Sequence, residues 1–230
     1  PATAVPTETP QPRKRPVNRH LPLQILLGFL LVYFLIPFWW VIVNSSKNAA
    51  GLFGGGSALW FADDVDWVGN VVQLFTFDGG IYGRWLLNSA LYAVVGGLGA
   101  TALAVAAGYG FAKYGFRGRR VSLAVLLGSV MVPATALVIP TFIMFSQLGL
   151  PNTIWAVILP SLLNPFGVYL MLVYPRDAVP DELLDAARVD GAGEYRTFFQ
   201  VALPLLRPAI VTVLLLSVVA SWNNYFLPLA

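Results

Sequence analysis

Residues 85–112 read WLLNSALYAVVGGLGATALAVAAGYGFA, and this stretch contains no Asp, Glu, Lys or Arg. The hydrocarbon core of a bilayer is about 30 Å thick, so roughly 20 apolar residues in a helix cross it. A soluble protein would need a large polar shell to bury such a helix. The composition does not provide one, because 57% of the 230 residues are hydrophobic and only 11% are charged. A soluble enzyme and a disordered chain are therefore both excluded.

Four further stretches share this length and lack of charge. They are residues 21–43, 121–145, 153–173 and 208–230. The sequence therefore predicts an all-α, polytopic membrane protein in which one transmembrane domain, residues 21–230, has five visible spans. Residues 44–84 and 174–207 are the two longest connections between these spans.

The basic residues predict the orientation of the spans. Of the 14 Lys and Arg residues, only Lys47 and Arg84 fall on one side of the membrane in this arrangement. The positive-inside rule makes the other, basic side cytoplasmic. The N-terminus and residues 174–207 are then cytoplasmic, and residues 44–84 are external. The proline-rich residues 1–20 are expected to form a disordered cytoplasmic tail.

Several kinds of chemistry are absent from the sequence. It has no cysteine and one histidine, His20, which excludes thiolate catalysis and a cysteine or histidine metal cluster. No Gly-Lys pair occurs, so the chain has no phosphate-binding loop of the ATPase type. We therefore expect a non-catalytic subunit that binds no metal and no cofactor of its own.

The most informative connection contains PDELLDAARVDG at residues 180–191. Pro180 suits the first turn of a helix, and Asp181 and Glu182 complement the positive end of its dipole. Gly191 is suited to ending that helix. A second short helix is predicted at residues 194–202, ending before Leu203-Pro204 because proline disfavours helix in the residue before it. Physical reasoning alone leaves two interpretations open: a docking helix for another protein, or a helix lying at the lipid headgroups.

This connection resembles the EAA motif of binding-protein-dependent ABC importer permeases. The pattern is E-A-A, three residues, G, nine residues, I, one residue and L-P, and this chain matches its full spacing. Asp and Val replace the usual Glu and Ile, at positions 185 and 201. The matching residues are Asp185, Ala186, Ala187, Gly191, Val201, Leu203 and Pro204.

Other segments resemble the carbohydrate-uptake branch of that family, and in particular the smaller, G-type permease of the maltose system. They are RWLLNS at 84–89, YGFRGR at 114–119, LGLPNT at 148–153 and SWNNYF at 221–226. The family has six spans, so we expect a sixth beyond the five visible here. The resemblance implies import of a sugar or oligosaccharide, with polyols and glycerol phosphate also open.

The resemblance also implies an assembly in a bacterial cytoplasmic (inner) membrane. Its other members are a homologous second permease, two cytoplasmic ATPases that carry ATP and magnesium, and an external solute-binding protein. The connection around residues 185–191 would dock on an ATPase as a coupling helix. Membrane lipid is an expected partner, and nucleic acid is not.

Uncharged polar side chains within the spans are candidates for the solute pathway, because amides donate to and accept from sugar hydroxyls and an aromatic ring can stack on a sugar face. Contacts between helices are the alternative explanation for the amides. The candidates are Asn88, Asn164, Trp222, Asn223 and Asn224.

Three other classes of protein compete with an importer. An ion-coupled secondary transporter often has charged residues within its spans, and an intramembrane enzyme would need reactive ones. Neither kind of residue is present in the five stretches. A membrane scaffold that transports nothing stays open.

Overall fold

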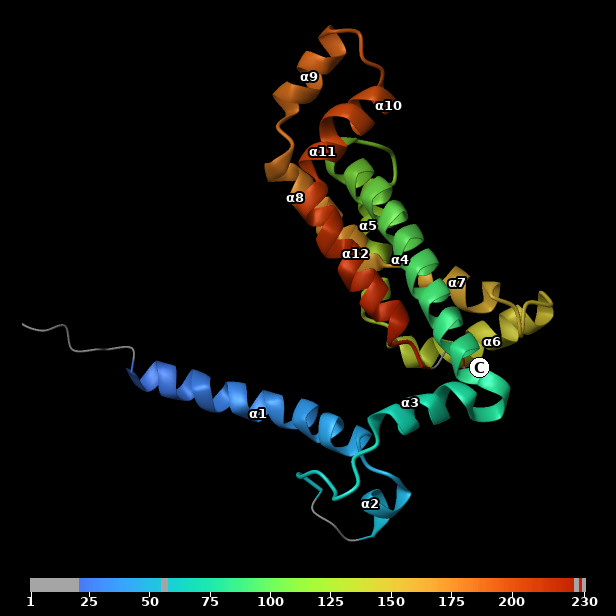
Figure 1. Ribbon diagram of the computed structural model, residues 1–230. Helices are drawn as coiled ribbons and strands as arrows, with labels where there is room; N and C mark the ends of the chain where they lie inside the picture. Colours follow the sequence, from blue (N-terminus) through green and yellow to red (C-terminus); the bar gives the residue numbers. More distant parts are fainter. Residues whose placement is uncertain (1–20, 55–57, 226–227, 229–230) are drawn as a thin grey trace, which may run out of the picture. The chain divides into compact units, whose positions relative to one another are not determined.

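The computed structural model describes residues 21–54, 58–225 and 228, and the predicted tail at residues 1–20 lies outside them. In these ranges the chain is helical, with one isolated antiparallel bridge between Lys47 and Val65. It divides into two compact units, which meet in sequence between Tyr82 and Gly83 and are described separately (Figure 1).

The first unit contains one long helix and two short ones, α1 (Leu21–Ser45), α2 (Ala49–Phe53) and α3 (Trp67–Thr76). Nearly every side chain of α1 is exposed, as expected for a helix that faces lipid. Asn48 and Asp66 cap α2 and α3 by accepting backbone N–H groups. The segment that sequence analysis places outside the membrane is therefore partly helical.

The second unit holds the elements that build the candidate site. They are most of α4 (Ile81–Lys113), then α5 (Arg119–Val130), α6 (Val138–Gln147), α7 (Trp155–Ser161), α8 (Pro165–Ala178), α9 (Asp181–Val189), α10 (Glu194–Thr197), α11 (Leu203–Leu205) and α12 (Arg207–Trp222). The second unit also contains the short turns η2 (Ala134–Leu137) and the π-helical η3 (Phe198–Ala202), whereas η1 (Phe77–Gly80), which precedes α4, belongs to the first unit.

Small residues let the helices of the second unit pack closely. α4, α8 and α12 run side by side (Figure 1), and Gly108 of α4 lies directly against Met171 of α8. Gly97 packs in the same way on Val218 of α12, where an added Cβ would lie 2.5 Å from a Val218 methyl group. Such close backbone approach stabilises helix packing in lipid, where van der Waals contact rather than hydrophobicity drives association.

Two of the predicted spans are interrupted. The span expected at 121–145 is broken into α5 and α6, whose axes bend by 97°. The break lies around Pro133, which has no N–H to continue the helical ladder. The span expected at 153–173 consists of α7 and α8, separated by residues 162–164. Three stretches of the described chain are long and apolar enough to cross a membrane, or five if each bent pair is one span.

The predicted end of the second short helix is wrong. Helical structure continues from Glu194 through Leu205, and the chain bends by 79° only at Leu206, before α12. The reason lies in η3, whose wider π-helical turn accommodates the proline that follows it. α12 itself ends at Trp222, short of the expected end of the fifth span.

Candidate functional site

The elbow loop, defined as residues 179–206, carries the EAA-like sequence. Its first limb is α9 and its second limb is the continuous run α10–η3–α11 (Figure 1). α9 ends at Val189, and two residues further on Gly191 has φ +81°, a left-handed conformation that glycine adopts without steric cost. The N–H of Ala192 then donates to the carbonyl of Ala187 at 2.9 Å, which satisfies one of the last carbonyls of the helix.

Two buried leucines anchor the elbow loop to the helices below it. Leu184 of α9 and Leu206, at the bend before α12, are both members of the hydrophobic core of the second unit. Asp185, Ala186 and Gly191 are exposed on the loop. The remaining motif positions are partly buried: Ala187, Val201, Leu203 and Pro204. The motif thus has an anchored side and an exposed side.

Two large apolar side chains stand out on the exposed side of the elbow loop. Val189, the last residue of α9, is 88% exposed, and Tyr195 of α10 is 85% exposed. Both side chains are open to contact from outside the described chain. Sequence analysis did not single out either residue, because exposure of one position on a short helix cannot be inferred from the motif.

An ion network joins the two limbs. The Arg188 guanidinium donates from Nε to Glu194 Oε1 at 2.9 Å and from one NH₂ group to Asp185 Oδ1 at 2.8 Å. The hydrogen bonds from Arg188, and then one from Tyr114, hold the pKa of Glu194 below its usual value. The same two carboxylates raise the pKa of Arg188, so this cation stays charged. The Arg188–Glu194 pair links α9 to α10, and the Arg188–Asp185 pair lies within α9.

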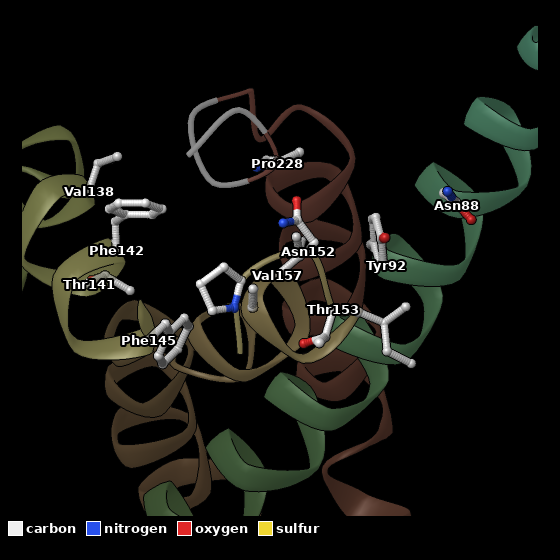
Figure 2. A pocket seen from close by; sticks show the side chains of 13 residues that line it. Asn88, Tyr92, Val138, Thr141, Phe142, Phe145, Asn152, Thr153, Val157 and Pro228 are labelled. Carbon is white, nitrogen blue, oxygen red and sulfur yellow. The ribbon is translucent and has the colours of Figure 1, made fainter. Parts of the chain in front are cut away.

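The second feature is a cavity of about 370 Å³, here called the polar cavity. Figure 2 shows side chains from the first turns of α4, from α6 and from the loop before α7 converging on it. The lining residues are Asn88, Tyr92, Val138, Thr141, Phe142, Phe145, Pro151, Asn152, Thr153, Ile154, Ala156, Val157 and Pro228.

Four polar side chains in the polar cavity have free hydrogen-bonding groups. Within the described residues, the side chains of Asn88, Tyr92, Thr141 and Asn152 bond to no other protein group. No lining residue is charged, and Phe142 adds an aromatic ring. This combination suits a neutral, hydroxyl-rich solute, which needs donors, acceptors and a flat apolar face.

Only Asn88, among the five pathway candidates from the sequence, lines the polar cavity. Asn164 instead caps α8 by accepting the N–H of Gly167, and it donates to Ser217 of α12. Asn223 donates to the carbonyl of Val219 in its own helix. Trp222 is exposed and Asn224 partly buried, and neither lines this cavity.

Comparison with known proteins assigns the family. A family model described as a binding-protein-dependent transport system inner membrane component matches residues 100–230. The chain belongs to this family.

Individual relatives of this permease agree with that assignment. It is 33% identical over 218 residues to the arabinooligosaccharides transport system permease protein AraQ of Halalkalibacterium halodurans, covering 94% of this chain and 77% of the relative. It is 31% identical to the lactose transport system permease protein LacG of Rhizobium radiobacter, covering 89% and 71%.

A solved structure has the same fold as the permease. It is the crystal structure of a bacterial ABC transporter involved in the import of the acidic polysaccharide alginate. The TM-score is 0.79 at 25% sequence identity, with 94% of this chain and 75% of that chain covered. These matches confirm the predicted all-α membrane fold and the resemblance to carbohydrate-branch permeases. The family consists of transport components rather than enzymes.

Proposed function

We propose that this permease forms half of the translocation pathway for a sugar or oligosaccharide. Relatives with 30% identity or more are named for transport of arabinooligosaccharides, lactose and maltodextrin, and all of these are carbohydrates. The polar cavity has matching chemistry, since its free amide and hydroxyl groups are uncharged. The other half is a homologous second permease, and an external solute-binding protein delivers the solute.

The elbow loop is the contact with one of the two cytoplasmic ATPases of the assembly, which bind ATP and magnesium. The observation that carries this assignment is the match of the EAA spacing to a helix that exposes Asp185, Ala186 and Val189 while Leu184 anchors it. The basic residues at the ends of the helices support a cytoplasmic position for this loop. The membrane is then the bacterial inner membrane, with the N-terminus inside.

Co-purification of the ATPase with the assembled transporter tests the coupling role. Gly191→Val should reduce co-purification, because a β-branched residue at φ +81° distorts the end of α9. Gly193→Val is the matched control, since Gly193 has φ −70° and nothing within 4 Å of an added Cβ. Equal recovery of the ATPase with both variants would contradict a coupling helix and favour a scaffold that transports nothing.

Asp185→Lys tests the same surface by charge. Asp185 is exposed, and its carboxylate accepts from Arg188 alone among the described residues, so membrane insertion should persist. ATP-driven uptake should be lost. Uptake that continues without ATP but follows an ion gradient would instead support an ion-coupled transporter.

A panel of labelled arabinooligosaccharides, maltodextrin and lactose would test the solute class.

A further inference from the structure

The cytoplasmic end proposed for α4 is tied to the beginning of α9. Lys113, the last residue of α4, donates from Nζ to the carbonyl oxygen of Val179 at 2.6 Å and to Asp181 Oδ1 at 2.7 Å. The Lys113 side chain is only 7% exposed, whereas that of Asp181 is 77% exposed. Solvent weakens the ion pair on the Asp181 side. Burial of the ammonium group makes the two bonds hard to break, because a separated Lys113 would be a buried, unpaired charge.

A second tie joins the same end of α4 to the other limb of the elbow loop. Tyr114, the next residue, donates from its hydroxyl to Glu194 Oε2 at 2.6 Å, at the first residue of α10. Glu194 is in turn held by Arg188 of α9. Desolvation, and then the bond to Glu194, raise the pKa of Tyr114, so its hydroxyl stays a donor. Both limbs are therefore bound to one helix end.

α4 also reaches the polar cavity without a break. Its helix continues from Gly83 to Lys113 with no proline, and its early turns carry Asn88 and Tyr92. The 25 residues from Asn88 to Lys113 span about 37 Å at 1.5 Å per residue. The route from the elbow loop through α12 bends by 79° before that helix, and the route through α8 passes a short non-helical stretch at residues 162–164.

We propose that α4 transmits movement of the elbow loop to the polar cavity, with Lys113 and Tyr114 as the positioning residues that fasten it. This inference rests on the proposed function, because it assumes that ATPases move the loop. A helix fastened to both limbs moves with them as one body. Its far end then carries Asn88 and Tyr92 relative to α6 and the loop before α7, which changes the shape of the cavity.

The ratio of solute imported to ATP hydrolysed, in the complete reconstituted transporter, tests the proposal. Lys113→Glu and Asp181→Lys should each lower that ratio on the order of tenfold, as expected for a lost coupling between sites. The combined swap should restore part of it, because the carboxylate introduced at position 113 can pair with the ammonium group at position 181 but cannot donate to the Val179 carbonyl. Asp177→Lys is the charge control, because Asp177 is exposed and makes no ion pair within the described part of the chain. Unchanged ratios in both single variants would overturn the proposal.

A cleavable cross-link gives a sharper test. The chain has no natural cysteine, so Lys113→Cys with Asp181→Cys introduces its only two thiols. We expect a low import-to-hydrolysis ratio before linking, recovery with a short reducible linker, and loss again after reduction. Inhibition by the linker would overturn the proposal, because it would mean that α4 and α9 must separate. A folding defect alone would not make the import-to-hydrolysis ratio rise on linking and fall again on reduction.

Two controls separate this proposal from the proposed function. If the ATPases co-purify and hydrolyse ATP with the Lys113 variants while import fails, the elbow loop docks and transmission through α4 is lost. If the unmodified chain binds no ATPase, the proposed function itself fails. Gly110→Pro, which breaks α4 between the tie and the cavity, should reproduce the loss, and Gly110→Ala should not, because an added Cβ there has open space.

Discussion

Asn164 Nδ2 lies 2.8 Å from Ser217 Oγ, and this bond joins the start of α8 to the middle of α12. The other end of the same amide accepts the N–H of Gly167 at 2.8 Å, which caps α8. The oxygen and the nitrogen of the Asn164 side chain are thus both hydrogen-bonded within the protein. The structure therefore favours a stabilising role for Asn164.

Asn164→Ala should lower thermal stability without changing the affinity for solute. Loss of the cap costs about 0.5–2 kcal/mol, and the lost bond to Ser217 adds about 0.6 kcal/mol, a typical value for bonds between membrane helices. Asn164→Asp keeps the cap and can accept from the Ser217 hydroxyl, but it introduces a charge at a partly buried position, so it should also lower the melting temperature. Thermal melting in detergent, together with the KM for uptake, measures both effects. A raised KM at an unchanged melting temperature would instead indicate that Asn164 contacts the solute.

Gly108→Ala should destabilise the permease strongly, because the added Cβ would overlap the Cβ and backbone of Met171. Overpacking of this kind typically costs about 1–3 kcal/mol. Gly110→Ala, two residues along the same helix, is the matched control: it has no neighbour within 4 Å and gains up to about 1 kcal/mol of helix propensity. Yield and melting temperature distinguish them. Similar behaviour of the two variants would contradict close packing of α4 on α8.

Glu194 should contribute to stability over the whole neutral and mildly acidic range. Its pKa is lowered by Arg188 and then by Tyr114. A carboxyl with a lowered pKa stabilises the fold above its unfolded pKa, about 4.3, and loses this effect as pH falls through the folded value. The stability difference between the natural chain and Glu194→Gln should therefore be constant from pH 8 to about pH 5 and shrink only below about pH 4.3. If this stability difference already shrinks between pH 7 and pH 5, Arg188 and Tyr114 do not lower the pKa of Glu194.

Thr141→Val should raise the KM for solute and leave ATP hydrolysis unchanged. The substitution removes one free hydroxyl from the polar cavity while keeping the side-chain volume. One lost hydrogen bond of about 1 kcal/mol corresponds to roughly a fivefold change. Thr212→Val of α12 is the control, since that hydroxyl bonds only the Pro208 carbonyl of its own helix. An equal effect of both variants would exclude the cavity as a solute site.

The elements that depend on local sequence were predictable. The apolar stretches could be located from their length and their lack of charged residues. Pro180 and Gly191 indicated where α9 begins and ends, because proline and glycine each act on the backbone at a single residue. The breaks in the third and fourth spans were not, since a proline in lipid can either kink a helix or end it according to its neighbours. The π-helical turn before Pro204 depends in the same way on packing beneath the elbow loop.

The candidate site was only partly predictable for a different reason. The EAA spacing identified the elbow loop, but the ties from Lys113 and Tyr114 join residues 66 to 80 positions apart in sequence. The polar cavity likewise combines α4 with α6 and the loop before α7. Single amides in a span look alike in the sequence, so tertiary contacts alone separated Asn88 from Asn164.

Photo-cross-linking from Val189 tests most directly whether the elbow loop receives the ATPase. A photoreactive residue at this 88% exposed position should form an adduct with an ATP-hydrolysing subunit in native membranes. The same residue at Leu215, exposed on α12, should react with lipid or another membrane subunit instead. An adduct between position 189 and the external solute-binding protein, or none with the ATPase while the transporter is active, would contradict the account.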